Sequence, residues 1–512
     1  MGITPARSKG RPPWPCFGAA ACVGAGLLVL GVKPAAAQTA PVATAQTAPP
    51  ISEAQRQHME QELQQLLSMR GEFDQRIRAL EVELHGSSNV GAEAAPDIER
   101  ISGVQAQAAP PPPVRWGGFE PGKGVILMRS DVAEVDLGLV SYLRYLNQDG
   151  LAPTYTDFFG RTTNINRRQD FQLAKVQITV RGWLFDPRFG YNAYVWTSQA
   201  SQGLGAQVVV AGNLNYTFSD ALQVFFGVQS VPSTRSTNRT FPYWLRNDNR
   251  PIADEFFRGS YTQGIWAQGT LARGLQYRVM IANNLSALGV SAAQLDPKID
   301  TFSGALTWMP STGEFGPGNG FGDFEDHQKV ATLFSAHYTR STETPQSQPN
   351  TDSIENTQIR LSDGTLLFAV DAFNTPGRIT QALYQMMALD AAVKYKGYSL
   401  EAEYYSRWLG DFKTVGVIPV THLYDDGFSL QASAMAIPKT LQVYFSGSMI
   451  FGQYGDPYDA ALGFNWFPFH RRDFRLAVMG LYTYHSPVGY TAYPVPVGAT
   501  GFTFVSDLSL AF

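Results

Sequence analysis

The sequence predicts an all-β protein: a transmembrane antiparallel β-barrel of about sixteen strands, preceded by a short α-helical coiled coil. Three observations predict this fold. The chain starts with an export-type segment, it alternates apolar and polar residues from Trp116 onward, and it ends on a strand closed by Phe512. Of its 512 residues, 12% are aromatic and only 16% are charged, which suits a large β body better than a helical one.

The first 37 residues have the layout of a signal peptide. Basic residues without acids precede an apolar stretch at 16–32, and three alanines stand before Gln38. Removal of this segment takes away four basic residues and no acidic ones, so the formal charge changes from -4 to -8. Both cysteines, Cys16 and Cys22, leave with it, so we expect no disulfide in the mature protein.

Residues 38–85 form a separate helical segment, predicted to lie in the periplasm. Apolar residues recur there with heptad spacing, which is typical of a coiled coil. At its end Arg76, Ile77, Leu80 and Glu81 have the spacing found in three-stranded coiled coils. A solitary amphipathic helix is the alternative, and whether the segment trimerises or binds an envelope partner stays open. Residues 86–113 are a linker rich in Pro, Ala and Gly, stiff at its four final prolines.

Residues 114–512 contain the predicted barrel. Many of its strands are about ten residues or longer, as tilted spanning strands require. Short gaps alternate with long ones, which indicates short turns at the periplasmic end and longer outer loops. The sixteen predicted strands are 133–147, 169–185, 189–199, 205–218, 221–231, 258–271, 274–285, 298–309, 327–340, 385–396, 398–409, 427–437, 439–452, 457–468, 472–485 and 499–512.

Two stretches disturb this alternation of gaps. Residues 310–326 make an unusually long inner turn, and residues 364–373 look like a strand that would break the parity if it spanned. We therefore place 364–373 in the loop 341–384. Whether this stretch crosses the membrane as a strand stays open. An inner aromatic girdle is expected beside the short turns. Its predicted members are Trp183, Phe185, Trp308, Trp466, Phe467 and Phe469.

The last strand has one apolar and one polar face. Leu510 and Phe512 belong to the lipid-facing set, whereas Thr503, Asp507 and Ser509 are expected to face a wet lumen. An edge strand of a soluble sandwich is the alternative for this strand alone. In a barrel it must pair with strand 133–147, and its terminal Phe resembles the signal read by the outer-membrane assembly machinery.

The loop 232–257 is the most charged segment and is long enough to fold into the lumen. Guanidinium groups bind phosphate and carboxylate oxygens in pairs, so an anion-attracting constriction is one interpretation. The other is an exposed loop whose bases pair with its own acids or with lipopolysaccharide. The candidate solute-binding residues are Arg235, Arg239, Arg246, Arg250 and Arg258, together with Lys175 and Arg181 on lumen-facing positions of the strand 169–185. Arg278 and Arg475, also on lumen-facing positions, are expected to help draw anions through the barrel.

The stretch 222–288 resembles the phosphate-selective porin O/P family, and the shorter stretch Lys396–Tyr405 resembles it as well. The residues that carry the resemblance are Arg258, Gly264, Gly269, Gly274, Leu275, Tyr277 and Asn283. The resemblance implies a homotrimeric sixteen-stranded outer-membrane porin whose solutes cross a basic constriction. Family members known for phosphate use lysine at the narrowest point, and this loop has none, so diffusion of small anionic or neutral solutes in general stays open.

Other functions have little support in the sequence. The seven histidines of the mature chain have no nucleophile or metal spacing; His327 and His337, for example, lie ten residues apart. Each histidine is expected at a rim or girdle. We expect no enzyme activity, no cofactor, no metal and no nucleic-acid partner, only solutes, lipid, lipopolysaccharide and the assembly machinery. The alternative function is a structural or adhesive anchor in the outer membrane, with an envelope-binding coiled coil.

Overall fold

The computed structural model describes residues 117–120, 123–198, 207–286, 298–348, 358–489 and 493–512. The chain divides into two units, 1–106 and 107–512. The predicted signal peptide, the coiled coil with Arg76, Ile77, Leu80 and Glu81, and most of the linker lie outside the described residues. They remain predictions.

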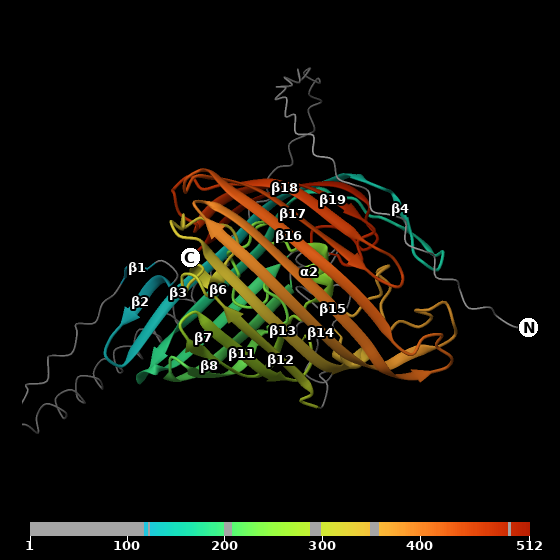
Figure 1. The fold of residues 1–512 in the computed structure, drawn as a ribbon, viewed down its shortest axis with the longest axis horizontal. Coiled ribbons are helices and arrows are strands. Elements are labelled where there is room, and N and C mark those ends of the chain that lie inside the picture. Colours follow the sequence, from blue (N-terminus) through green and yellow to red (C-terminus); the bar gives the residue numbers. More distant parts are fainter. Residues whose placement is uncertain (1–116, 121–122, 199–206, 287–297, 349–357, 490–492) are drawn as a thin grey trace, which may run out of the picture. The chain divides into compact units, whose positions relative to one another are not determined.

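Sixteen antiparallel strands form the wall of a closed barrel (Figure 1). Each of the sixteen predicted segments overlaps one of them, so the predicted barrel is confirmed, although several strands extend beyond the predicted bounds. The strands are β3 (Ala133–Leu151), β6 (Gln169–Leu184), β7 (Asp186–Ser198), β8 (Gln207–Ser219), β9 (Leu222–Ser230), β10 (Tyr261–Ala272), β11 (Leu275–Ala282), β12 (Thr301–Trp308), β13 (Ala331–Glu343), β14 (Arg378–Tyr395), β15 (Tyr398–Val415), β16 (Leu423–Ile437), β17 (Leu441–Phe451), β18 (Tyr458–Trp466), β19 (Phe474–Tyr484) and β20 (Gly501–Ala511).

The barrel closes between its first and last wall strands. β3 pairs with β6 on one side and with β20 on the other, where Leu508 lies opposite Leu143. Beyond β20, Phe512 and Leu139 exchange two backbone hydrogen bonds of 2.9 Å. The predicted pairing of the terminal strand with the first wall strand is therefore confirmed.

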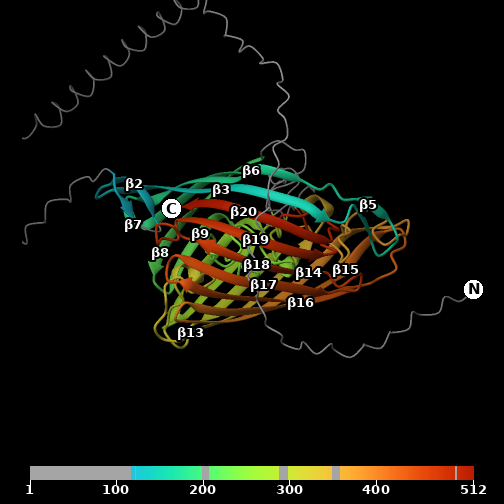
Figure 2. The same ribbon diagram turned by 90° about the horizontal axis from the view of Figure 1, so that it is seen from above.

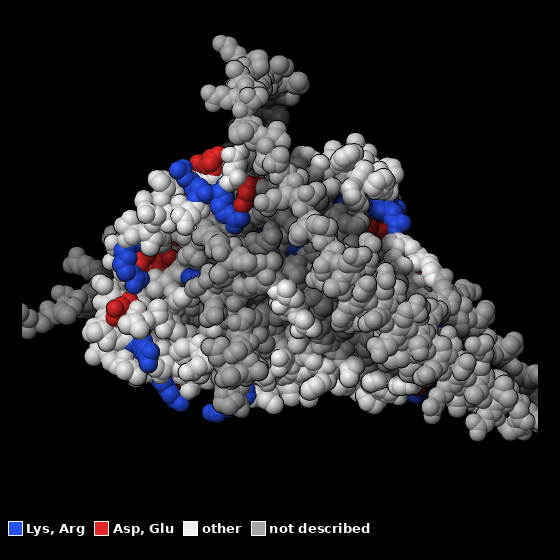
Figure 3. Space-filling view, turned by 180° about the vertical axis from the view of Figure 1, so that it is seen from behind, with Lys and Arg blue, Asp and Glu red and all other residues white. Residues whose placement is uncertain are grey.

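The wall carries its apolar side chains outside and its polar side chains inside. In β15, Leu400, Tyr404 and Trp408 are exposed, whereas Glu401 and Glu403 between them are buried. β20 shows the same pattern, with Thr503, Asp507 and Ser509 buried as predicted. Where Figure 3 draws described residues at the edges of one face, Lys, Arg, Asp and Glu side chains are visible among uncharged ones. Such alternation suits a barrel with lipid around it and water inside.

The two ends of the barrel differ. Single residues or short turns join strands at one end, such as Lys396–Gly397 between β14 and β15, and the C-terminus lies at this end (Figure 2). We call it the short-turn end. It also carries the small strands β1 (Phe119–Glu120) and β2 (Gly124–Arg129), which extend the sheet beside β3. The opposite, long-loop end carries the longer connections and the hairpin of β4 (Thr154–Thr156) with β5 (Thr162–Asn164).

The aromatic girdle at the short-turn end is only partly as predicted. Phe185, Trp308, Trp466 and Phe469 are exposed on the outside. Phe467 instead packs inside the barrel on Phe324, with ring centroids 4.8 Å apart.

Trp183 also differs from the girdle prediction. It lines the lumen, and its indole N–H donates to Glu134 over 3.3 Å. Trp183 and Phe467 point inward because each finds a lumenal partner that the strand pattern does not reveal.

The long-loop end is filled by an apolar cluster. It joins Leu146 of β3, Phe256 of the short helix α2 (Ile252–Phe257), Leu367 and Tyr493. Residues 364–373 lie here as turns and do not span, and residues 358–377 contain a single bridge, Arg360 to Leu366. Two 3-10 turns complete the described elements, η2 (Pro317–Asn319) and η3 (Pro345–Ser347). In the described part of the chain, no helix has the length and hydropathy needed to cross a membrane.

Candidate functional site: the lumen of the barrel

The connection between β9 and β10, residues 231–260, folds into the lumen. Its residues are largely buried, and α2 within it contacts β15, β16, β17 and β18. Because β9 and β10 lie on the opposite side of the barrel from these strands, the loop crosses the lumen. We refer to residues 231–260 as the lumenal loop.

Arg246 is the strongest link between the lumenal loop and the far wall. Its guanidinium donates to Asp459 of β18 over 2.5 Å, and to the hydroxyl and carbonyl oxygens of Ser446 of β17 over 2.8 Å each. Both charged side chains are almost completely buried. A desolvated charge pair of this kind fixes position, because either partner alone would be left as an unpaired buried charge.

The other predicted loop arginines are also paired, apart from Arg239. Arg235 approaches Glu401 of β15 at 3.2 Å, and Arg258 approaches Glu255 at 2.6 Å. Arg250 lies 3.3 Å from the same Glu255 and 3.8 Å from Asp254. Arg246, Arg235, Arg250 and Arg258 therefore hold the loop and offer little charge to a solute.

Neighbouring groups complete the anchoring of the loop. Lys175 of β6 donates to Asp248 over 2.8 Å, and Arg475 of β19 donates to Asn247 and to the carbonyl oxygen of Trp244. Asp254 accepts a hydrogen bond from Thr234, and burial raises the pKa of its carboxyl group. Lys175, a predicted solute contact, is thus a partner of the loop.

The long inner turn 310–326 folds up from the short-turn end to meet the lumenal loop. The amide of Phe321 donates to the carbonyl oxygen of Tyr243 over 2.8 Å, and Arg235 donates to the carbonyl oxygen of Asn319. Gly322 donates its amide to Glu401, the same carboxylate that pairs with Arg235. Turn and loop therefore form one packed partition within the barrel.

A polar cavity of about 1050 Å³ lies on the β3 to β11 side of this partition. It reaches from Lys123, Glu134 and Trp183 near the short-turn end up to Ser230 and Tyr261 beside the lumenal loop. Among the described residues of the long connections 152–168, 344–377 and 485–500, none lines it.

Two arginines in the cavity have no carboxylate partner among the residues that the structure describes. Arg239 of the lumenal loop is exposed to the cavity, and its enclosure by protein lowers its pKa from the usual range. Arg278 of β11 is oriented by Gln268, whose side-chain oxygen accepts two hydrogen bonds of 3.1 and 2.8 Å. Gln268 in turn donates to Gln223. Guanidinium groups keep their proton in proteins, so both side chains bring positive charge to the cavity.

Other charged side chains also line the cavity. The predicted Arg181 lines its wall opposite Asp136 of β3. Nearer the mouth, Glu134 is neutralised by Lys123 and Arg129 at 2.7 and 2.8 Å. Among the described residues that line the cavity, Arg239 and Arg278 are thus cationic side chains without a carboxylate partner.

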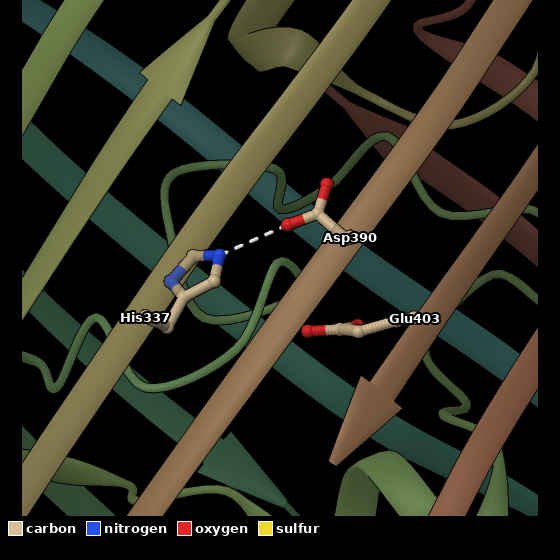
Figure 4. Close-up of side chains that lie close together, drawn as sticks. All are labelled: His337, Asp390 and Glu403. Atoms are coloured by element: carbon tan, nitrogen blue, oxygen red, sulfur yellow. Dashed lines mark hydrogen bonds and ion pairs between the residues drawn. The ribbon is translucent and has the colours of Figure 1, made fainter.

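His337 departs from the expectation that each histidine lies at a rim or girdle. His337 is completely buried on the lumen face of β13, where it meets Asp390 of β14 and Glu403 of β15 (Figure 4). Spacing along the chain does not reveal this group, because its members come from three different strands. The short turn at Lys396–Gly397 was the available signal, since it places Asp390 opposite Glu403.

No protein-family model matches the chain, and no curated protein matches it in sequence. Among solved structures, the chain is similar to an anion-selective porin from Comamonas acidovorans, with 11% identity and a TM-score of 0.43 over 74% of this chain and all of that one. It is also similar to the outer-membrane channel DcaP of Acinetobacter baumannii, with 10% identity and a TM-score of 0.46 over 74% of this chain and 98% of the other.

A third similar structure is OmpF of Salmonella typhi in complex with daunomycin, with 12% identity and a TM-score of 0.44 over 75% of this chain and 98% of that one. These scores are too low to add to the description of the chain. The assignment of a closed barrel depends on the strand pairing within this chain alone.

Proposed function

We propose that this protein is an outer-membrane porin for small solutes, with a preference for anions that arises at Arg239 and Arg278. One observation carries the proposal: a sixteen-stranded barrel with an apolar outside encloses a polar cavity in which these two guanidinium groups lack carboxylate partners among the described residues. Barrels of this size are wide enough for an aqueous channel, and the charges that line its narrow part set selectivity.

The proposal moves the selectivity away from most of the arginines that the sequence singled out. Arg235, Arg246, Arg250, Arg258 and Lys175 act as fixed supports of the lumenal loop, whereas Arg239 and Arg181 keep the role of solute contacts. A small phosphate or carboxylate is the class of anion that guanidinium groups bind best. The resemblance to phosphate-selective porins supports the same class of solute.

Conductance across a planar bilayer tests the proposal. In a KCl gradient the wild-type protein should give a reversal potential of the sign for anions. A guanidinium group and an anion a few ångströms apart in water attract each other by about 1 kcal/mol. That energy raises the local concentration of anions by about fivefold. Arg239→Gln should therefore lower the preference for chloride over potassium by about fivefold, and the Arg239→Gln/Arg278→Gln double variant should lower it further.

Arg273→Gln is the matched control. Arg273 lies in the turn between β10 and β11, outside the lining of the cavity, and donates to the carbonyl oxygen of Thr312. Its loss should leave the reversal potential unchanged. A cation-selective wild-type channel would refute the anion preference, and an absence of conductance steps would refute the porin and favour the anchor.

We also propose that the protein forms a homotrimer in the outer membrane, with the coiled coil in the periplasm. The three-stranded signature at Arg76 to Glu81 and the sequence resemblance support this assembly. Cross-linking of membranes that contain the full chain should give a trimer ladder. A ladder that persists after the 38–85 segment is deleted would show that the barrel, and not the coiled coil, supplies the contact.

A further inference from the structure

A buried group of three metal-ligand side chains lies on the lumen face of the wall, at the base of the lumenal loop. His337, Asp390 and Glu403 come from the adjacent strands β13, β14 and β15. One ligand atom from each lies within 4.8 Å of the other two, and all three residues are buried (Figure 4). The three side chains come from rigid strands, so their positions are set by the register of the sheet.

The histidine is oriented as a metal ligand is. Its Nδ1 lies 3.0 Å from the carbonyl oxygen of Pro232, the second residue of the lumenal loop. A carbonyl oxygen only accepts, so Nδ1 carries a hydrogen and donates it. The other nitrogen, Nε2, points at Asp390 over 3.0 Å. Histidines that bind metals commonly donate their free ring N–H to a backbone carbonyl in this manner, which directs the second nitrogen to the ion.

The two carboxylates need a cation between them. Asp390 and Glu403 are directly opposite each other across the strands, where like charges destabilise a sheet. Glu403 accepts hydrogen bonds from the amide of Arg235 and the hydroxyl of Tyr405, at 2.9 and 2.8 Å. The Oδ1 atom of Asp390 is buried with no hydrogen-bond partner. Such an orphaned charged oxygen is costly unless something binds it.

We propose that His337 Nε2, Asp390 and Glu403 bind one divalent transition-metal ion, with Zn²⁺ as the best match. One imidazole and two carboxylates are ligands that zinc takes, and three protein ligands leave a position for water. The ion would offset the repulsion between the carboxylates of Asp390 and Glu403. This metal site is independent of the proposed channel function, since binding of the ion requires no solute to cross the barrel.

The ion would also hold the start of the lumenal loop against the wall. Its ligands bond directly to the backbone of Pro232 and of Arg235, the residues where the loop leaves β9. A proton on His337 is the competing occupant, since an imidazolium would pair with Asp390 without any metal. The two occupants differ in one measurable respect, the presence of stoichiometric metal.

The test uses full-length protein purified from membranes, incubated with zinc chloride and passed through gel filtration. Metal analysis should give about one zinc ion per barrel. X-ray absorption at the zinc edge should show only nitrogen and oxygen neighbours, at about 2.0–2.2 Å. His337→Gln and Asp390→Asn should each lose the bound zinc, while heat-shifted mobility on gels verifies that the barrels are folded.

His327→Gln is the matched control, because His327 also bonds to a carboxylate, Asp323, but belongs to no three-ligand group among the described residues. It should keep the zinc. Wild-type protein without stoichiometric zinc, or His337→Gln protein with an undiminished content, would overturn the proposal. So would sulfur neighbours in the absorption spectrum. The absorption measurement on the wild type stands even where a variant fails to fold.

Discussion

Replacement of Arg246 by Ala should detach the lumenal loop from the far wall. The change removes the contacts to Asp459 and Ser446 and leaves the carboxylate of Asp459 buried without its cationic partner, although the hydroxyl of Ser448 still donates to it. Loss of one partner of a buried charge pair costs about 3–5 kcal/mol. Both side chains are almost fully enclosed, so solvent screening does not reduce this cost.

That cost converts into a change in loop docking. A loss of about 3–5 kcal/mol lowers the ratio of docked to undocked loop by about 150- to 5,000-fold. Hydrogen exchange of peptides from the loop should accelerate by a similar factor where it proceeds through undocking. Single-channel conductance should rise or become noisier, because the partition in the barrel loosens.

The double variant Arg246→Met/Asp459→Leu separates charge from packing. Replacement of a whole buried ion pair by apolar side chains is often neutral, so exchange in this variant should return toward the wild-type rate. An Arg246→Ala protein with wild-type exchange and conductance would refute the assignment of Arg246 as the main anchor. A double variant no slower than Arg246→Ala would show that its polar contacts to Ser446 matter more than the charge pair.

Three further predictions concern folding and processing. Gly274 has φ of 71°, and a Cβ there would lie 2.4 Å from the carbonyl oxygen of Met309, so Gly274→Ala should destabilise the barrel by more than the 1–2 kcal/mol of left-handed backbone alone. Urea unfolding measures this, and Gly304→Ala, whose nearest atom would be 3.6 Å away, should cost less. Deletion of Phe512 removes both backbone hydrogen bonds to Leu139 and the ring contact with Phe119, so less folded barrel should be recovered from membranes; an unchanged yield would argue against a closing role. Intact mass of the exported protein should correspond to a chain that begins at Gln38, and retention of residues 1–37 would contradict the signal peptide.

The barrel was predictable because it depends on local patterns. Alternation along each strand and the alternating gap lengths were enough to place all sixteen strands and to orient Asp507 and Ser509 inward. The length of the loop after β9 also indicated that it could enter the lumen. Each of these features is set by residues close together in the chain.

The partners of the loop arginines were not predictable in the same way. The guanidinium of Arg246 meets Asp459 from 213 positions away, and the backbone amide of Arg235 meets Glu403 from 168 positions away. These contacts depend on the curvature of the closed sheet and on the depth of the loop, which no local pattern encodes. The inward fold of the turn 310–326 escaped prediction for the same reason. His337 was missed because its neighbours come from two other strands.

The separation in sequence between the lumenal loop and its anchors bears on how the protein is built. The loop leaves the ribosome well before its partners, since Ser446 follows Arg246 by 200 positions and Asp507 follows Asn247 by 260. Contacts of such long range form late and slowly. A partly assembled barrel therefore holds Arg235 and Arg246 before β15 and β18 supply Glu401 and Asp459. Any chaperone that keeps this intermediate soluble has to tolerate these two guanidinium groups until those strands are in place.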